Sequence, residues 1–474
     1  MRIYFMGICG TAMGNTAIML KKLGHTVCWA DTDVYPPMSN VLIDAGIAIE
    51  DGFNPKKLEK LEPDLVVVGN VISRGNPEIE WLLETKRFKF TSLPALLQDF
   101  ILSDRYNIVI SGTHGKTTTS SIIAYLLYKL GSTPGYLIGG VPQDLPTGAC
   151  EGIKGGPFVI EGDEYDSAFF DKRSKFIDYL PSILIMNNLE FDHSDIFRDL
   201  FDVKQSFKHL LRIVPANGYV LINGDDSNIL SLFPISWARV IKVGVGEGNE
   251  LRIVGFQESA TESRFKLYWR GELWKEVVWN QPGLFNARNV AIGALAVGLT
   301  LNPENPTMIS LKEVSSFNGV KRRQELLIDN KKIKVLEDFA HHPTAVEEML
   351  KSIRCRYTKH KITVGFEPRS NTAKSDVFQQ EFARALIMAD EVMIGNIHNE
   401  QGFVPKSRLN TTQLAVDLIR GKVSAQAFSS NLDLLESLWN RVLERIDEDH
   451  IIIFFTNGSF DGIILKLVKR IKGL

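Results

Sequence analysis

The segment that most constrains this chain is residues 107–127, which read NIVISGTHGKTTTSSIIAYLL. Its apolar start predicts a buried strand over 107–110, and its later apolar spacing predicts a helix that begins near Lys116. The turn between them contains two glycines, which let the backbone wrap closely around phosphate oxygens. The helix N-terminus adds unpaired N–H donors and the positive end of a dipole. The segment therefore predicts an α/β unit that binds a nucleotide phosphate.

The side chains of this turn fit that prediction. Lys116 supplies a positive charge near the terminal phosphates, and the Thr117 hydroxyl can ligate Mg²⁺. The turn is two residues shorter than the general GxxxxGK[ST] pattern, so a glycine-rich turn without a ligand is the alternative. The order of strand, glycine pair, Lys-Thr and helix favours the phosphate site. Its residues are Gly112, Thr113, His114, Gly115, Lys116, Thr117 and Thr118.

Acidic residues follow two further predicted strands. Residues 158–160 form a short apolar run that ends at Glu161, and the run 183–186 leads to Asp192 and His193. In open α/β sheets this edge faces the ligand crevice. A carboxylate and an imidazole at neighbouring strand ends can hold a second divalent cation. Mg²⁺ prefers oxygen ligands, so a structural role for His193 stays open.

The N-terminus carries a second glycine-rich turn, GICGTAMG, over residues 7–14. It resembles a dinucleotide fingerprint, but Cys9 occupies the middle glycine position, which weakens an NAD site. A diphosphate from a UDP-sugar would use the same helix end, and a turn without a ligand is the third possibility. The residues expected to line a UDP-sugar crevice are Gly7, Cys9, Gly10, Thr11, Met13, Gly14, Asp31, Asn70 and Ser73.

Length and composition set the frame for these sites. A chain of 474 residues predicts two to four domains. Short β-rich runs alternate with helical stretches, which predicts an α/β fold with parallel sheets. Strand-then-loop beginnings recur near residues 3, 107 and 362, and each could open its own sheet. The polar stretch 102–107 and the basic stretch 319–324 place boundaries near residues 105 and 320.

Charge and cysteine use exclude other classes of protein. The net charge of -2 gives no reason to expect a nucleic-acid partner. The four cysteines are scattered without a CxxC pair, which fits a reducing cytoplasm. The N-terminus lacks the features of a signal peptide, and no apolar run looks long enough to cross a bilayer. We therefore expect a cytoplasmic protein without membrane insertion.

The motifs together resemble the Mur ligases over essentially the full chain. The matching pieces, in the family's order, are GICGTAMG, SGTHGKTTT, EGDEYD, NNLEFDH, PGLFNARN, VKRRQE and DFAHHPTA. The resemblance implies three α/β domains: a Rossmann-like UDP-sugar domain over 1–105, a P-loop ATPase domain over 106–320, and a Rossmann-like amine-substrate domain over 321–474.

The resemblance also implies roles for single residues. Lys116, Glu161 and His193 would be catalytic, and Thr117, Glu161 and His193 would hold Mg²⁺. Asn286 and Asn289 would recognise adenine, although Phe285 stands where alanine-adding members usually have histidine. Arg323 and Asp338 would reach ATP from the linker and the third domain. Lys204 aligns poorly with a lysine that some members carbamylate, so we expect it to be a surface residue.

Five segments resemble the branch of the family that works in peptidoglycan recycling. They are YPPMS, SRGNPE, DEYDSAFFDKRSKF, EPRSNT and TNGSFDG. That branch joins UDP-N-acetylmuramate to the tripeptide L-alanyl-γ-D-glutamyl-meso-diaminopimelate, with ATP and Mg²⁺. Arg369 could grip a peptide carboxylate bidentately, with a solvated arginine as the alternative. The expected peptide-site residues are Arg369, Ser370, Asn371, His341 and His342.

Ligation requires an activated carboxylate, and phosphorylation by ATP supplies a leaving group. The amine then attacks in its neutral form, and His193, His341 or His342 could act as general base. Three other functions stay open: ligation of free L-alanine, a nucleotide-dependent switch or binding protein, and an NAD-dependent oxidoreductase. The oligomeric state is not predicted.

Overall fold

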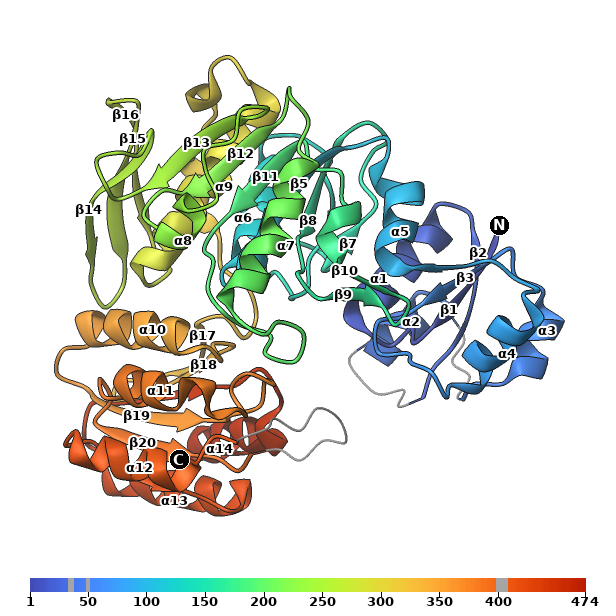
Figure 1. The fold of residues 1–474 in the computed structure, drawn as a ribbon. Helices are drawn as coiled ribbons and strands as arrows, with labels where there is room; N and C mark the ends of the chain where they lie inside the picture. The colour runs from blue at the N-terminus through green and yellow to red at the C-terminus, as the bar shows by residue number, and fades with distance from the viewer. Residues whose placement is uncertain (33–37, 48–51, 398–407) are drawn as a thin grey trace.

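The described residues form three large sheets, which Figure 1 shows as a blue, a green and an orange-to-red part, and one small two-stranded sheet. The structure is a computed structural model that describes residues 1–32, 38–47, 52–397 and 408–474. The three strand-then-loop units expected near residues 3, 107 and 362 are β1, β5 and β19, which lie in three different sheets, although β17 and β18 come before β19 in the third sheet. The green part lies between the other two (Figure 1).

The N-terminal part is a parallel sheet in the order β2-β1-β3-β4. Residues 3–6 are fully buried in its middle strand, as the continuous apolar run requires of a strand covered on both faces. The elements are β1 (Arg2–Met6), α1 (Thr11–Lys22), β2 (Thr26–Ala30), α2 (Met38–Asp44), α3 (Pro55–Leu61), β3 (Leu65–Val68), α4 (Pro77–Thr85), β4 (Phe90–Ser92), α5 (Leu93–Leu97) and η1 (Gln98–Leu102).

The large sheet of the central part has ten strands in the order β16-β15-β14-β13-β12-β11-β5-β8-β6-β7, and β9 and β10 pair antiparallel in a separate small sheet. Strand β5 lies between β11 and β8 and runs parallel to both, so the loops after all three meet at one edge. The elements are β5 (Tyr106–Ser111), α6 (Lys116–Lys129), β6 (Gly135–Leu137), β7 (Ala149–Cys150), β8 (Pro157–Glu161), β9 (Asp166–Ala168), β10 (Asp171–Ser174), η2 (Lys175–Asp178), β11 (Ile183–Met186), α7 (Leu200–Arg212), β12 (Tyr219–Asn223), α8 (Ser227–Leu230), β13 (Arg239–Gly244), β14 (Leu251–Glu258), β15 (Ser263–Trp269), β16 (Glu272–Trp279), α9 (Leu284–Leu301), η3 (Pro306–Met308) and η4 (Lys312–Ser316).

Among its described residues, the C-terminal part has six strands in the order β17-β18-β22-β19-β20-β21, of which β17 alone pairs antiparallel. Its elements are β17 (Glu325–Asp329), β18 (Ile333–Asp338), α10 (Pro343–Arg356), β19 (Lys361–Phe366), η5 (Asp376–Phe378), α11 (Gln379–Leu386), β20 (Glu391–Ile394), α12 (Thr411–Arg420), β21 (Ser424–Ala427), α13 (Asn431–Glu444), β22 (His450–Phe455), η6 (Phe460–Gly462) and α14 (Ile463–Lys472).

Helix α9 corrects the expectation that no apolar run is long enough to cross a bilayer. By length and composition alone its 18 residues pass that test, with a mean hydropathy of 1.4. The helix packs against α6 and β12–β14, and 72% of it is buried inside the protein. Its apolar character therefore serves the core of the central part.

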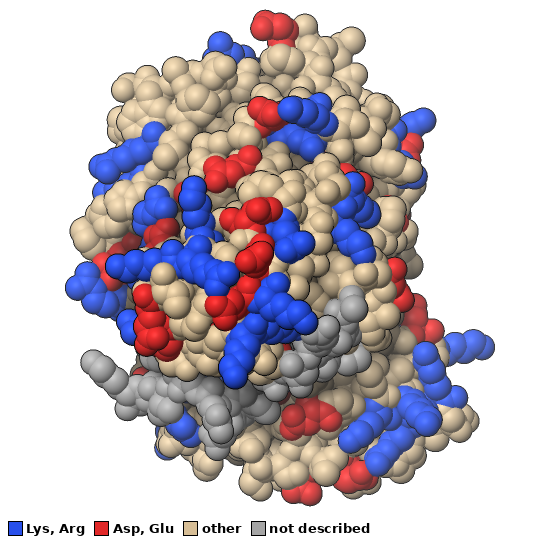
Figure 2. Space-filling model, turned by 90° about the vertical axis from the view of Figure 1, so that its right-hand side faces the viewer, with Lys and Arg blue, Asp and Glu red and all other residues tan. Residues whose placement is uncertain are grey.

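The surface mixes both signs of charge. Figure 2 shows the face that the N-terminal part presents, where Lys and Arg groups lie beside Asp and Glu groups across its middle. This distribution matches the nearly balanced composition of 54 basic and 56 acidic side chains.

Candidate active site

The turn after β5 has the backbone that its glycines predict. Gly112 has a φ of +131° and Gly115 a φ of +80°, a region that side chains other than glycine rarely adopt. An added Cβ on Gly115 would meet the side-chain oxygen of Asn289 at 2.8 Å. Gly115 caps α6 without a side-chain hydrogen bond, so the first N–H groups of that helix stay open to a ligand.

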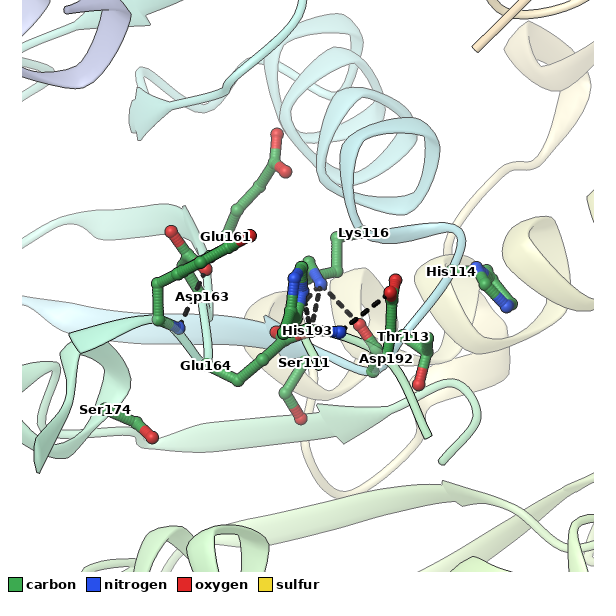
Figure 3. A network of polar contacts seen from close by, with 12 residues as sticks. Ser111, Thr113, His114, Lys116, Glu161, Asp163, Glu164, Ser174, Asp192 and His193 are labelled. Atoms are coloured by element: carbon green, nitrogen blue, oxygen red, sulfur yellow. Dashed lines mark hydrogen bonds and ion pairs between the residues drawn. The ribbon is translucent and has the colours of Figure 1, made fainter. Parts of the chain in front are cut away.

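Lys116 is held by a carboxylate that sequence reasoning did not single out. Its ammonium group donates to both oxygens of Glu164, at 2.9 and 3.2 Å, and to the Gly112 carbonyl at 2.6 Å. The other partner of Glu164 is the ring of His193, at 3.0 Å. Figure 3 shows Lys116, Glu164 and His193 pointing toward one another. The signal in the sequence was the position of Glu164, three residues after Glu161 on the same strand-end loop.

Burial and pairing oppose each other in this group. Burial by itself would lower the pKa of Lys116, but Glu164 and Asp163 outweigh it and raise that pKa. Burial would also lower the pKa of His193, but the hydrogen bond that its ring donates to Glu164 raises it. Burial would raise the pKa of Glu164, and Lys116 holds it below its usual range. The result is a buried cation next to a buried anion, which a phosphate can replace as partner.

Glu161 and Thr117 form a separate oxygen pair. The Thr117 hydroxyl donates to one carboxylate oxygen of Glu161 at 3.0 Å, and the Gly139 amide donates to the other at 2.7 Å. Burial raises the pKa of Glu161 despite these bonds. A hydroxyl and a buried carboxylate are ligands that suit Mg²⁺. His193 has its ring nitrogen on Glu164 in this arrangement, and Figure 3 shows the Glu161 carboxylate pointing away from that ring.

One large cavity of about 830 Å³ covers this edge of the sheet. Residues of the central part, the 319–324 linker and the C-terminal part all line it. The predicted ATP-site residues that line it are Thr113, His114, Gly115, Lys116, Thr117, Thr118, Asn286, Asn289, Arg323 and Asp338, whereas Gly112 does not. The N-terminal part contributes Ala12, Leu93 and Leu97.

Two amides and a linker close one side of the cavity. Asn289 accepts from Thr119 at 3.1 Å and donates to Asn286 at 3.2 Å. Asn286 in turn donates to the side-chain oxygen of Gln324 at 3.1 Å. Asp338 accepts from the Gln324 backbone amide at 2.8 Å, which fixes the linker against β18. The predicted adenine residues therefore contact the linker that joins the two parts.

Arg323 lies over the ring of Phe339 at 4.5 Å. Burial lowers the pKa of Arg323, although Asp338 and Glu161 act in the opposite direction. Burial raises the pKa of Asp338, against Arg323 and the bonds from Gln324. The guanidinium group is thus placed between carboxylates of the central and C-terminal parts.

The N-terminal glycine turn is stabilised by contacts with other residues of the N-terminal part. The Cys9 amide donates to Asp31 at 2.7 Å, so Asp31 supports the turn directly. Gly14 is required for packing, because an added Cβ would meet Met38 at 2.5 Å. Gly7, Met13 and Gly14 are buried, whereas Gly10, Thr11, Asn70 and Ser73 are exposed. Of YPPMS, residues 35–37 lie outside the described residues.

The predicted peptide-site residues lie in two places. His341 lines the cavity, 3.7 Å from Asp192, whereas His342 is only 3% exposed and caps α10. Arg369, Ser370 and Asn371 are half-buried and do not line the cavity. The neighbouring Thr372 hydroxyl accepts from the Ser194 amide at 3.2 Å, so this segment reaches the loop that carries His193. Lys204 is half-buried on α7.

Comparison with known proteins decides the family. The pattern described as "Mur ligase family, catalytic domain" matches residues 2–105, and the pattern of the Mur ligase middle domain matches residues 110–297. A protein of Escherichia coli, named UDP-N-acetylmuramate–L-alanyl-γ-D-glutamyl-meso-2,6-diaminoheptandioate ligase, is 37% identical over 99% of this chain and 98% of its own length. This chain belongs to the Mur ligase family.

Two further Mur ligases resemble this chain with lower sequence identity. A UDP-N-acetylmuramate–L-alanine ligase of Clostridium botulinum is 29% identical over 97% of this chain and 95% of its own. The crystal structure of a murein peptide ligase from Psychrobacter arcticus matches with a TM-score of 0.71 and 31% identity, covering 100% of this chain and 99% of that one. The expected α/β Mur ligase fold is confirmed, and the chain is an ATP-dependent ligase that forms carbon–nitrogen bonds.

Proposed function

We propose that this Mur ligase joins UDP-N-acetylmuramate to L-alanyl-γ-D-glutamyl-meso-diaminopimelate through an acyl-phosphate, in the recycling of peptidoglycan. The observation that carries the proposal is the full-length likeness to an enzyme named for that reaction. The sequence identity to that enzyme is 37%, whereas the identity to the alanine ligase is 29%. The use of ATP, UDP-N-acetylmuramate and a peptide as substrates supports a site of action in the cytoplasm. The small number of cysteines supports the same location.

Each part of the chain has its own task in this proposal. Residues 1–105 hold the UDP-sugar, residues 106–320 bind ATP, and residues 321–474 bring the peptide. The cavity supports this division, because side chains of all three ranges line it. The glycine turn at residues 7–14 offers the open N-terminus of α1 to a diphosphate.

Lys116 and the amides at the start of α6 position the terminal phosphates. The ammonium group leaves Glu164 for the γ-phosphate, which carries more negative charge. The muramate carboxylate oxygen attacks the γ-phosphorus in line, ADP leaves, and an acyl-phosphate forms. The residues act by placing the reactants and neutralising charge, because phosphoryl transfer needs little covalent help from the protein.

Mg²⁺ would be held by Thr117 and Glu161, whose oxygen donors suit it. When bound, the metal lessens the repulsion between the carboxylate and the γ-phosphate. His193 belongs to the same set only if its ring leaves Glu164, to which it is hydrogen-bonded at 3.0 Å.

The amine of the peptide attacks the acyl carbon, and phosphate leaves. His341 is the general base that this arrangement favours, because it lines the cavity, whereas His342 is buried and occupied. Arg369 binds a peptide carboxylate once the peptide enters beside the loop of Ser194.

A substrate matrix tests the proposal. The purified protein is incubated with ATP, Mg²⁺ and UDP-N-acetylmuramate, together with L-alanine, the tripeptide or the corresponding tetrapeptide, and the products are identified by mass spectrometry. We expect the tripeptide amide as the main product, formed at least tenfold faster than the alanine amide. Faster use of L-alanine would assign the chain to the alanine-adding activity, and ATP hydrolysis without any amide would indicate a nucleotide switch.

A further inference from the structure

A cluster of side chains beside the phosphate-binding turn joins the central and C-terminal parts. It consists of His114 in the turn after β5, Glu190 in the loop after β11, and His342 at the start of α10. One side-chain donor atom from each lies within 4.8 Å of the others. His114 Nε2 is 4.0 Å from Glu190, and His342 Nδ1 is 3.4 Å from the other oxygen of the same carboxylate.

The ring nitrogens of the cluster are placed as metal ligands are. His342 Nε2 lies 3.2 Å from the Phe191 carbonyl, to which it can only donate. Because Nε2 then carries the proton, the lone pair is on Nδ1. The Nδ1 atom faces Glu190 and accepts a long hydrogen bond of 3.3 Å from the Thr344 amide. A backbone carbonyl that accepts from the other ring nitrogen, and so fixes the tautomer, is usual for metal-bound histidine. His114 Nε2 is buried and has no hydrogen-bond partner among the described residues.

The charge state of the cluster also suits a cation. Burial lowers the pKa of His114 well below its usual range and lowers that of His342 to about 4. Both rings are therefore neutral near pH 7, with lone pairs available. Glu190 is partly buried, with 27% of its side chain exposed, and burial raises its pKa. The Thr344 hydroxyl donates to it at 2.6 Å. A partly buried carboxylate that faces two neutral imidazoles gains from a bound cation.

Among the described residues, the side chains of the cluster form no hydrogen bond or ion pair with the Lys116–Glu164–His193 group or with the Thr117–Glu161 pair, although His114 and Glu190 line the same cavity. Figure 3 shows His114 lying apart from Lys116, Glu164 and His193, on the outer side of the turn. Its ring instead contacts the ring of His342, with centroids 4.7 Å apart. Two imidazoles and one carboxylate match Zn²⁺ or Co²⁺ rather than Mg²⁺. Bonds of about 2.0–2.2 Å place tetrahedral ligand atoms about 3.4 Å apart, a spacing that Glu190 and His342 already have.

We propose that His114, Glu190 and His342 bind one Zn²⁺-class ion, which fastens the C-terminal part to the nucleotide-binding turn. His114 closes the site by moving toward Glu190. A bound ion would fix α10 to the turn and so hold the C-terminal part against the central part. The proposal does not depend on which amine the enzyme uses.

Titration of the protein with Co²⁺, followed by visible absorption, tests the site. The wild-type protein is titrated in the presence of excess Mg²⁺, which occupies oxygen-rich sites. We expect one equivalent of Co²⁺ to give a tetrahedral absorption band. Glu190→Gln, and His342→Asn, which keeps an acceptor for the cap of α10, should weaken Co²⁺ binding at least tenfold. His209→Gln, an exposed histidine on α7, should bind as the wild type does.

Two results would overturn the proposal. One is equal Co²⁺ affinity in the wild type, Glu190→Gln and His342→Asn. The other is loss of the band in His193→Gln, which would place the ion at the phosphate site. Thermal melting with one equivalent of Zn²⁺ provides a second readout, because the melting temperature should rise for the wild type and for His209→Gln but not for Glu190→Gln. Circular dichroism without metal verifies that each variant is folded.

Discussion

At the scale of single residues, Lys116 has the most sharply defined place. It is buried, and its charge is shared between Glu164 and the Gly112 carbonyl. Replacing it removes the cation that meets the γ-phosphate, and it leaves Glu164 without its counter-charge.

We expect Lys116→Ala to lower ADP formation by at least about 10³-fold, the scale of a lost phosphate-stabilising cation. Binding of UDP-N-acetylmuramate should stay within about twofold, because Lys116 lies in the central part; calorimetry and a coupled ADP assay measure the two. Lys172→Ala, which removes an exposed lysine paired with Asp166, is the control. Retained turnover in Lys116→Ala would remove Lys116 from the mechanism.

A buried histidine far from the site sets an acid limit on stability. His450 is fully buried next to Thr363, and burial lowers its pKa to about 4. The unfolded chain keeps the usual value near 6.5, so it binds the proton first as pH falls. The contribution of His450 is therefore complete above about pH 6.5 and is lost between there and pH 4, with a total of about 3 kcal/mol.

The direction of this pH dependence can be tested by comparing the wild type with a variant at His450. The melting temperature of His450→Gln should fall less between pH 7 and pH 4.5 than that of the wild type, because glutamine cannot take up the proton and can still contact Thr363. Parallel curves for the two proteins would show that His450 does not carry this dependence.

At the scale of elements, helix α10 of the C-terminal part packs against the antiparallel strands β14–β16 of the central part. Glu258 at the end of β14 accepts from the Ser352 hydroxyl of α10 at 2.7 Å. Arg356, the last residue of α10, donates to the carbonyls of Ala260 and Asn280 at 3.3 and 3.1 Å. These contacts join the central part to the part that carries His341.

Loss of Arg356 should loosen this contact. Arg356→Ala removes partly exposed charged hydrogen bonds, which together are worth about 1–2 kcal/mol. We expect faster hydrogen exchange at the amides of α10, with little change in β5 or β8. Arg420→Ala, an exposed arginine on α12, should leave exchange in α10 as it is. Unchanged exchange in Arg356→Ala would mean that α10 is held by other contacts.

Local elements could be predicted from the sequence, but their partners could not. The apolar runs that predicted β1, β5, β8, β11 and β19 are confirmed, because a buried parallel strand requires a continuous apolar run. Glu161 and Lys116 were found because each directly follows a glycine turn or a strand. Glu164 and Glu190 were missed, because their contacts to Lys116 and Thr344 join segments 48 and 154 residues apart. The domain boundaries and the roles of the site residues stay predictions.

At the scale of the whole molecule, the cavity depends on the C-terminal part lying against the central one. Arg369 enters the chemistry only if the peptide bridges from the cavity to the EPRSNT segment. We therefore expect Arg369→Ala to raise the KM for the tripeptide at least tenfold and the KM for ATP less than twofold. Steady-state kinetics measure both, and Arg384→Ala on α11 is the control. Equal changes in the two KM values would argue against a peptide carboxylate at Arg369.

The central claim is that the γ-phosphoryl group passes to a sugar-borne carboxylate before the amine attacks. UDP-N-acetylmuramate labelled with ¹⁸O in both carboxyl oxygens tests it most directly, with mass spectrometry of the released phosphate. The account predicts one ¹⁸O atom in each phosphate formed together with the tripeptide amide. Phosphate that carries no ¹⁸O would contradict it.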